Sequence, residues 1–186
     1  PMLGQTDLSV IPEFFADKIS MQYGGGSAQW GSGAVGGAVL LNSATFFNKG
    51  VDAEVNIGAG SYGWLRQSFK TNYSNNRWIF NLKAFNDYSS NNFRFQNSIT
   101  LEKQFQKHAR TQGQGVLSEI VYRINKNGTL SIAAWLDKFN RQIPPVLNQT
   151  SDAKQKDDNL RITSQWRQQL PKGELAVRAA WFNQDI

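Results

Sequence analysis

Apolar and polar residues alternate with a period of two through most of the chain after residue 50. Successive side chains of a β-strand point to opposite faces, so this period predicts strands with one apolar and one polar face. Most of the runs approach the ~9–11 residues that a tilted strand needs to cross a bilayer. We therefore predict an all-β chain with strands at Val51–Ile57, Leu65–Tyr73, Trp78–Ala84, Val116–Ile124, Leu130–Leu136, Leu160–Leu170 and Leu175–Trp181.

The connections between these runs alternate in length. Short turns are predicted at Ser74–Asn76, Asn125–Gly128 and Pro171–Gly173, and the Asn-Gly pair at 127–128 favours a hairpin because it tolerates positive φ. Gly58–Gly63 is intermediate, whereas Ser89–Gly113 and Arg141–Asp158 are long and polar. This order predicts an antiparallel up-and-down meander, with the three short turns at one end of the sheet and the long loops at the other.

The alternation fits two classes of protein. In a membrane barrel the apolar face meets lipid, and in a soluble β-sandwich it meets the core. Outer-membrane barrels have short turns at one end and longer loops at the other, which favours the barrel. A soluble β-sandwich that binds carbohydrate or protein through exposed aromatic residues is the alternative. The barrel interpretation places these residues on the hydrocarbon side: Trp78, Phe80, Leu82, Leu130, Ile132, Leu136, Leu160, Ile162, Leu175 and Val177.

A glycine-rich stretch, Tyr23–Asn42, has seven glycines in its twenty residues and lies between two short apolar runs. Glycine permits positive φ and close approach of another backbone, so we predict a strand–loop–strand packed on other backbone. Gly31–Gly36 has the GxGxxG spacing of a phosphate loop, but a dinucleotide fingerprint opens a helix and no helical period follows here. We therefore predict no helix in Gly24–Asn42.

The order of an apolar strand, Tyr-Gly, small residues, WGSGAVGG and a second apolar strand resembles the end of the plug domain of TonB-dependent outer-membrane receptors. Ser20 and Tyr23 depart from the pattern, because the family usually carries Glu and Arg there. Gly24, Trp30, Gly31, Gly36 and Gly37 would form the structural plug motif. The matching residues are Ile19, Gly24, Ser27, Trp30, Gly31, Ala34, Gly36, Gly37 and Val39.

The resemblance implies that residues 1–48 are the C-terminal part of a plug domain. Residues 49–186 would be the first seven strands of a roughly 22-stranded plugged transmembrane β-barrel. We expect the chain to be a fragment of such a receptor, with the TonB box and the remaining strands outside it.

The function that the resemblance implies is TonB-dependent active import of a scarce nutrient across the cell outer membrane. The partners would be the TonB complex, contacted through the N-terminal part that this chain lacks, the outer-membrane lipid and a small nutrient ligand. A ferric siderophore and cobalamin fit the sequence equally well. The candidate contacts offer ring faces and hydrogen bonds: Tyr62, Trp64, Phe93, Arg94, Phe95, Asn97, Arg141 and Gln142.

Composition and spacing argue against other classes of function. The charge of +6 and the pI near 9.7 invite nucleic acid, but the basic residues are spread singly, so we predict no nucleic-acid binding. His108, the one histidine, lies between Lys107 and Arg110 and is predicted to be a solvated loop residue, so no enzyme is expected. Lysines interrupt Asp152, Asp157 and Asp158, and cysteine is absent, so we predict a solvated charged loop with no metal and no cofactor.

Overall fold

The computed structural model describes residues 12–25, 36–43, 46–147 and 149–185. The chain divides into two compact units, Pro1–Thr45 and Phe46–Ile186. Outside the strands, the described residues form two single 3-10 turns, η2 (Glu13–Phe15) and η3 (Ser61–Gly63). No helix among the described residues has the length and apolar character needed to span a membrane.

The first unit is an antiparallel hairpin of β1 (Lys18–Tyr23) and β2 (Gly37–Asn42). Gly37 begins β2 with φ 153, and a Cβ atom there would lie 2.5 Å from the carbonyl oxygen of Gln22, so only glycine fits. The predicted strands on both sides of the glycine stretch are thus confirmed. A strand, not a helix, begins at Gly37, which removes the helix that a phosphate loop requires. Trp30 and Gly31, which the sequence assigns to the expected plug motif, lie outside the described residues.

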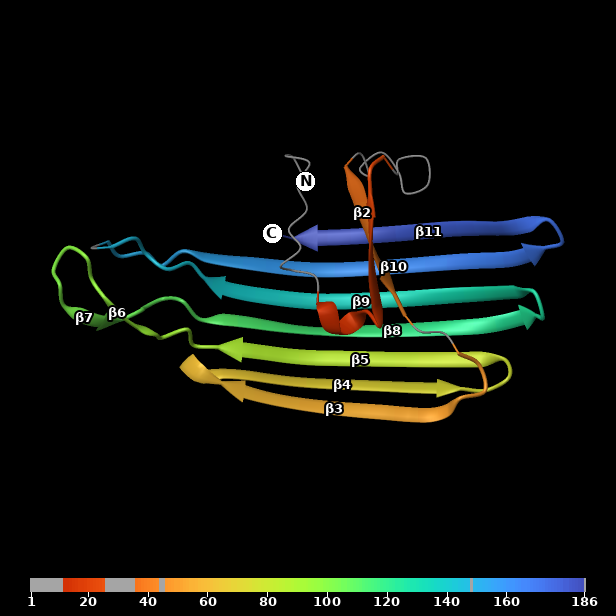
Figure 1. Ribbon diagram of the computed structural model, residues 1–186, viewed down its shortest axis with the longest axis horizontal. Helices are drawn as coiled ribbons and strands as arrows, with labels where there is room; N and C mark the ends of the chain where they lie inside the picture. The colour runs from red at the N-terminus through yellow and green to blue at the C-terminus, as the bar shows by residue number, and fades with distance from the viewer. Residues whose placement is uncertain (1–11, 26–35, 44–45, 148, 186) are drawn as a thin grey trace. The chain divides into compact units, whose positions relative to one another are not determined.

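The second unit is one sheet of seven antiparallel strands in the order β3, β4, β5, β8, β9, β10, β11 (Figure 1). Each strand pairs with the next long strand of the chain, which confirms the all-β, up-and-down meander. The sheet is open, because β3 and β11 each have one partner strand among the described residues. The bounds are β3 Gly50–Gly60, β4 Trp64–Ser74, β5 Trp78–Ser89, β8 Thr111–Asn125, β9 Gly128–Gln142, β10 Lys154–Leu170 and β11 Gly173–Asp185.

The two ends of the sheet differ as predicted. The turns β4–β5, β8–β9 and β10–β11 lie at one end, since Ser74 pairs with Ile79 and Gly128 pairs with Gln168. The connections β3–β4, β5–β8 and β9–β10 lie at the other end (Figure 1). We call these the turn end and the loop end.

Three sequence-based expectations need correction. First, the long loops are shorter than predicted, because β8 begins at Thr111 and β10 at Lys154, which makes β10 17 residues long. These strand ends carry polar side chains on both faces, so the apolar pattern did not reveal them. Second, the β5–β8 connection contains a small hairpin of β6 (Arg94–Gln96) and β7 (Lys103–Phe105).

Third, the predicted Asn-Gly turn forms, but without the positive φ on which its prediction was based. Neither Asn127 nor Gly128 is among the residues with positive φ. Instead the Asn125 side-chain oxygen accepts a hydrogen bond from the Asn127 backbone N–H at 2.8 Å, the local asparagine bond that is common in turns.

The strand register separates two faces of the sheet. Directly paired residues of an antiparallel sheet point to the same side. Phe80, Ile120 and Ile132 therefore share one face, because Ile120 pairs with both Phe80 and Ile132. We call it the apolar face and the opposite one the polar face. The strand pairing places all ten residues that the sequence analysis assigned to the hydrocarbon side on this apolar face.

Candidate functional site

The apolar face carries an aromatic group at the turn end. Trp78 on β5 contacts Tyr122 on β8 at 4.5 Å between ring centroids, and stacks with Phe80 at 5.7 Å. Phe80 in turn stacks with Tyr73 of β4 at 6.2 Å. Trp166 of β10 lies in the same transverse row, since it pairs with Leu130, the partner of Tyr122.

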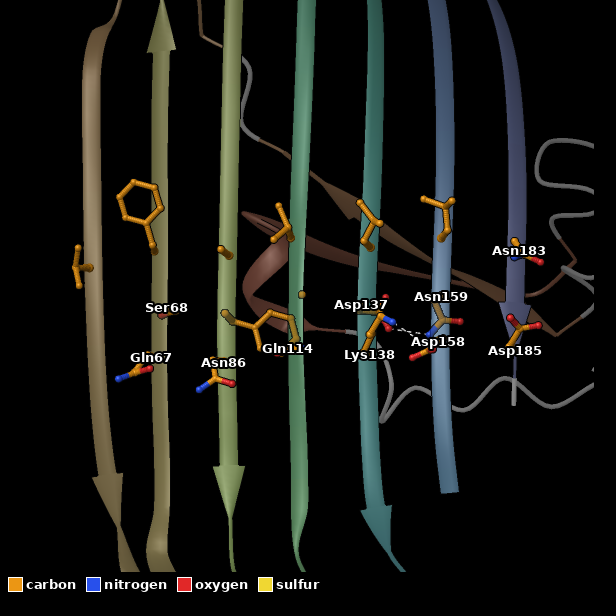
Figure 2. Close-up of a pocket in the computed structure, with 18 of the residues that line it drawn as sticks. Gln67, Ser68, Asn86, Gln114, Asp137, Lys138, Asp158, Asn159, Asn183 and Asp185 are labelled. Carbon is orange, nitrogen blue, oxygen red and sulfur yellow. Dashed lines mark hydrogen bonds and ion pairs between the residues drawn. The ribbon is translucent and has the colours of Figure 1, made fainter. Parts of the chain in front are cut away.

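A polar row crosses the same face nearer the loop end. Gln67, Asn86, Gln114, Lys138, Asp158 and Asp185 are directly paired from strand to strand, and Figure 2 shows them side by side. Lys138 Nζ lies 3.5 Å from Asp158 Oδ2, with both side chains mostly exposed. This ion pair is therefore a weak contributor to stability.

An apolar band lies between the polar row and the aromatic group. It consists mainly of aliphatic and aromatic side chains, with Thr71, Ser118 and Ser164 as small polar members. From the aromatic row at Trp78 to the polar row at Asn86 the strand rises about 26 Å at ~3.3 Å per residue, and a strand tilt of ~40°, as in membrane barrels, would reduce this height to about 20 Å. The apolar band of an outer-membrane barrel is ~25 Å tall, so the dimensions are similar.

A shallow groove of about 740 Å³ lies on the apolar face where the apolar band meets the polar row (Figure 2). Phe69, Val116 and Leu136 line its apolar side. Gln67, Asn86, Gln114, Lys138, Asp158 and Asp185 line its polar side, and Asn183, the partner of Leu160, lies on its apolar side.

The polar face is organised by hydrogen bonds between side chains on neighbouring strands. Asn81 of β5 accepts a bond from Asn72 of β4 and donates to Glu119 of β8 at 2.9 Å. Farther along the sheet, Gln184 of β11 donates to Asn159 of β10 at 2.9 Å, and Asn159 donates to Asp137 of β9 at 2.7 Å. These bonds satisfy polar groups that would otherwise be costly to remove from water.

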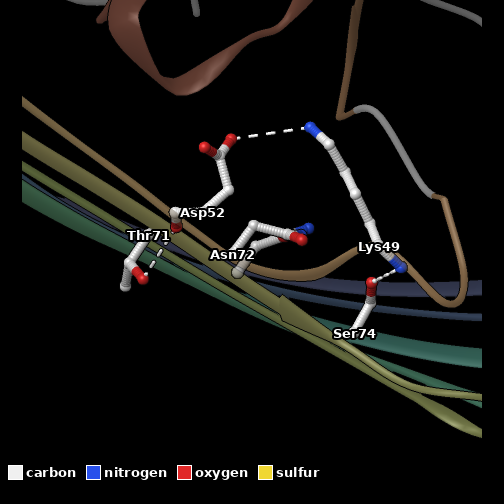
Figure 3. A network of polar contacts seen from close by, with 6 residues as sticks. Lys49, Asp52, Thr71, Asn72 and Ser74 are labelled. Atoms are coloured by element: carbon white, nitrogen blue, oxygen red, sulfur yellow. Dashed lines mark hydrogen bonds and ion pairs between the residues drawn. The ribbon is translucent and has the colours of Figure 1, made fainter.

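The turn end near β3 holds a smaller polar network (Figure 3). The Ser74 hydroxyl accepts a bond from the Lys49 backbone N–H at 2.9 Å, while Lys49 Nζ lies 3.5 Å from Asp52. Thr71 donates its hydroxyl to the Asp52 carbonyl oxygen at 3.1 Å. The network ties the start of β3 to β4.

Trp64, predicted as a ligand contact, is held by its own strand neighbours. Its Nε1–H donates to Asp87 at 3.1 Å, and Asp87 also accepts from Arg66 Nε at 2.6 Å. The indole lies over β3, because Cβ atoms at Gly58 and Gly60 would come within 3.0 and 2.9 Å of its ring. This arrangement gives Trp64 a packing role and explains both glycines.

Three predicted contact residues meet in an aromatic cluster at the loop end. The rings of Tyr62 and Phe93 lie edge to face at 5.9 Å, and those of Phe93 and Phe95 at 6.2 Å. Tyr62 has φ 61 and ψ 30, a left-handed conformation that is uncommon outside glycine. Tyr62 is 54% exposed and Phe93 is 39% exposed, so the cluster is accessible to a ligand.

The other predicted contacts are separate from this cluster. Asn97 is buried, and its side-chain oxygen accepts from the Ile99 and Thr100 backbone N–H groups, which makes it a turn-forming residue. Arg141 lies over the Phe139 ring at 5.4 Å, and Gln142 accepts from the Arg110 N–H at 3.1 Å. Arg94 is an exposed residue of β6.

His108 lies in a connection, as predicted, and is half-buried. Its ring Nε2 is 2.8 Å from the Ala153 carbonyl oxygen, so it joins the β5–β8 and β9–β10 connections. The prediction of a solvated charged loop for Asp157 and Asp158 was wrong, since both lie in β10 and point to opposite faces. Among the residues that the structure describes, no three histidine, cysteine or acidic side chains gather where they could hold a metal ion.

Sequence reasoning missed the polar-face residues Asp87, Asp137, Asn159 and Gln184. Each occupies one of the alternate strand positions that face away from the apolar side, and this alternation was the available signal for its orientation. The alternation does not reveal which polar residues pair across strands until the register is known. Comparison of the chain with protein-family models and with curated proteins gives no match.

Proposed function

We propose that this chain forms part of the wall and plug of an outer-membrane receptor that imports a scarce nutrient with energy from the TonB complex. The observation that carries the proposal is the apolar band across the seven-stranded sheet, backed by a polar, hydrogen-bonded face. A barrel wall needs this division, with lipid on one side and a polar lumen on the other.

The open edges of the sheet agree with the same proposal. The outer edges of β3 and β11, which are eleven and thirteen residues long, have no partner strand in the part of the chain that the structure describes. Closure into a barrel satisfies such edges, and we infer that further strands of a roughly 22-stranded barrel pair there. The soluble β-sandwich is less well supported, because the seven strands form one sheet rather than two stacked sheets.

The substrate side of the proposal rests on the aromatic cluster of Tyr62, Phe93 and Phe95 at the loop end. In this proposal the nutrient, a ferric siderophore or cobalamin, contacts these exposed rings before it enters the lumen. Glycine-rich residues around Gly24 and Gly36 support the assignment of the first unit to a plug.

The proposal is tested with the full-length receptor expressed in a host that lacks its own receptors for these nutrients. We expect the protein in the outer-membrane fraction, and uptake of a ferric siderophore or cobalamin that stops when the TonB complex is deleted. A protein that stays in solution without detergent would refute the proposal. Uptake that continues without the TonB complex would refute the energised mechanism.

The ligand site has its own prediction. Phe93→Ala removes one ring of the cluster and is expected to raise the dissociation constant of the nutrient about threefold to tenfold, the effect of losing one aromatic contact. Phe105→Ala is the matched control, because Phe105 is an exposed ring of the nearby strand β7. Equal effects of the two variants in a binding titration would argue against the cluster as the ligand site.

A further inference from the structure

Asn91, just after β5 at the loop end, is hydrogen-bonded to three parts of the second unit. Its backbone N–H donates to the Tyr62 carbonyl oxygen at 3.2 Å. Its side-chain oxygen accepts from the Ser89 hydroxyl at 2.8 Å, and its side-chain N–H donates to the Ala109 carbonyl oxygen at 2.9 Å. Ser89 and Ala109 are buried, which limits competition from water for these bonds. Asn91 therefore joins the β3–β4 connection to the segment that enters β8.

The hydrogen bonds continue from Ala109 to the β9–β10 connection. The ring Nε2 of the adjacent His108 lies 2.8 Å from the Ala153 carbonyl oxygen, and since a carbonyl oxygen only accepts, the ring donates. The same oxygen accepts from the Ile143 backbone N–H at 3.0 Å. The bonds thus run from the β3–β4 connection through Asn91 and His108 to the β9–β10 connection, and we call this series the loop-end tie.

Three residues of the loop-end tie have an uncommon backbone conformation. Tyr62, Asn91 and His108 have φ of 61, 50 and 53, in the left-handed region that few residues other than glycine adopt. Residues in this region persist where the surrounding structure holds them, and they concentrate at sites such as ligand clamps. Phe93, whose ring meets that of Tyr62 at 5.9 Å, follows Asn91 by two residues. The tie therefore fixes the backbone on both sides of this ring contact.

We propose that Asn91 is a positioning residue of the ligand site, which holds the rings of Tyr62 and Phe93 in place before the nutrient arrives. Through His108, the β9–β10 connection supports the same geometry without contacting the ligand. A preformed site loses less conformational freedom on binding, so the tie raises the affinity. The inference rests on the proposed function, because it takes the aromatic cluster as the ligand site.

The test measures dissociation constants with the full-length receptor in detergent. Ferrichrome, ferric enterobactin and cyanocobalamin are titrated separately, and the variants are compared on the probe that binds. Asn91→Gly keeps the positive φ and the backbone bond to Tyr62 accessible, but removes the side-chain bonds. We expect the dissociation constant to rise about threefold to tenfold, the effect of losing one hydrogen bond.

Coupling between variants separates positioning from stability. In a receptor that already carries Phe93→Ala, Asn91→Gly should change the dissociation constant less than about twofold, because it acts through that ring. His108→Gly should raise the constant as well, and its combination with Asn91→Gly should cost no more than the larger single effect, since both cut one tie. If Asn91 acted independently of the cluster, the factors would multiply.

Asn48→Gly is the matched control, because Asn48 is also an asparagine with positive φ, 64, but lies at the turn end beside β3. It should leave the dissociation constant unchanged. Unchanged binding in Asn91→Gly, or the same factor with and without the Phe93 ring, overturns the inference while energised uptake continues. If the unaltered receptor neither binds nor takes up any of the three probes, the proposed function fails instead.

Discussion

At the scale of single residues, glycines in β8 make room for aromatic rings on the polar face. A Cβ atom at Gly113 would lie 2.6 Å from the Phe139 ring, and one at Gly115 would lie 2.7 Å from the Phe85 ring. The two rings are 6.2 Å apart, so both lie over the backbone that the glycines leave uncovered. Glycine is required here for space, since neither residue has a positive φ.

Gly115→Ala tests this packing. The added methyl group would also come 3.0 Å from the Leu136 carbonyl oxygen, so a movement of the Phe85 ring alone would not relieve the crowding. We therefore expect a loss of about 1–3 kcal/mol in the free energy of unfolding. Urea unfolding of the full-length protein in detergent measures it. Gly173→Ala is the control, because no atom lies within 4 Å of its Cβ position, and it should be neutral or stabilising. A similar loss in both variants would contradict the packing argument.

At the scale of elements, short turns are held by asparagine side chains. In the β4–β5 turn, the Asn75 side-chain oxygen accepts from the Arg77 and Trp78 backbone N–H groups, each at 2.8 Å. The Asn75 N–H donates to the Trp78 carbonyl oxygen at 2.9 Å. Asn75 thus holds the turn between β4 and β5, two strands that contribute residues to the aromatic group on the apolar face.

Asn75→Ala removes the acceptor for both amides and should destabilise the protein by about 1–2 kcal/mol. Hydrogen exchange should speed up at Arg77 and Trp78 in particular. Asn76→Ala, one residue further in the same turn, changes an exposed side chain and should cost under about 0.5 kcal/mol. Equal exchange in the two variants would show that backbone pairing alone holds the turn.

The strands were predictable because a period of two in apolar residues is a strong signal wherever one face is apolar. That signal located each of the seven long strands and the ends at which they turn. It failed at the loop end of β8, β9 and β10, where both faces are polar, and at β6 and β7, which have three residues each. The turn-forming bonds of Asn97, a predicted ligand contact, could not be read from the sequence because they depend on the turn around it.

At the scale of the whole molecule, the sheet divides space into an apolar and a polar side, and the register makes this division testable at adjacent residues. Ile132 points to the apolar face, is 49% exposed and lies in the row of Phe80 and Ile120, at the turn-end side of the apolar band. Its neighbour Ala133 points to the polar face, where it pairs with Glu119 and Thr163.

Arginine substitutions at these two positions should therefore differ in cost. Ile132→Arg places a charge in hydrocarbon between the interface and the midplane, and should lower the free energy of folding in lipid by about 1–3 kcal/mol. Ala133→Arg places the same charge beside Glu119 on the polar face and should cost less. Folding into lipid vesicles by the full-length receptor, followed by the electrophoretic shift of the folded form, measures both variants. The opposite order would mean that the apolar face does not meet lipid, because a one-residue slip exchanges the two faces of every strand.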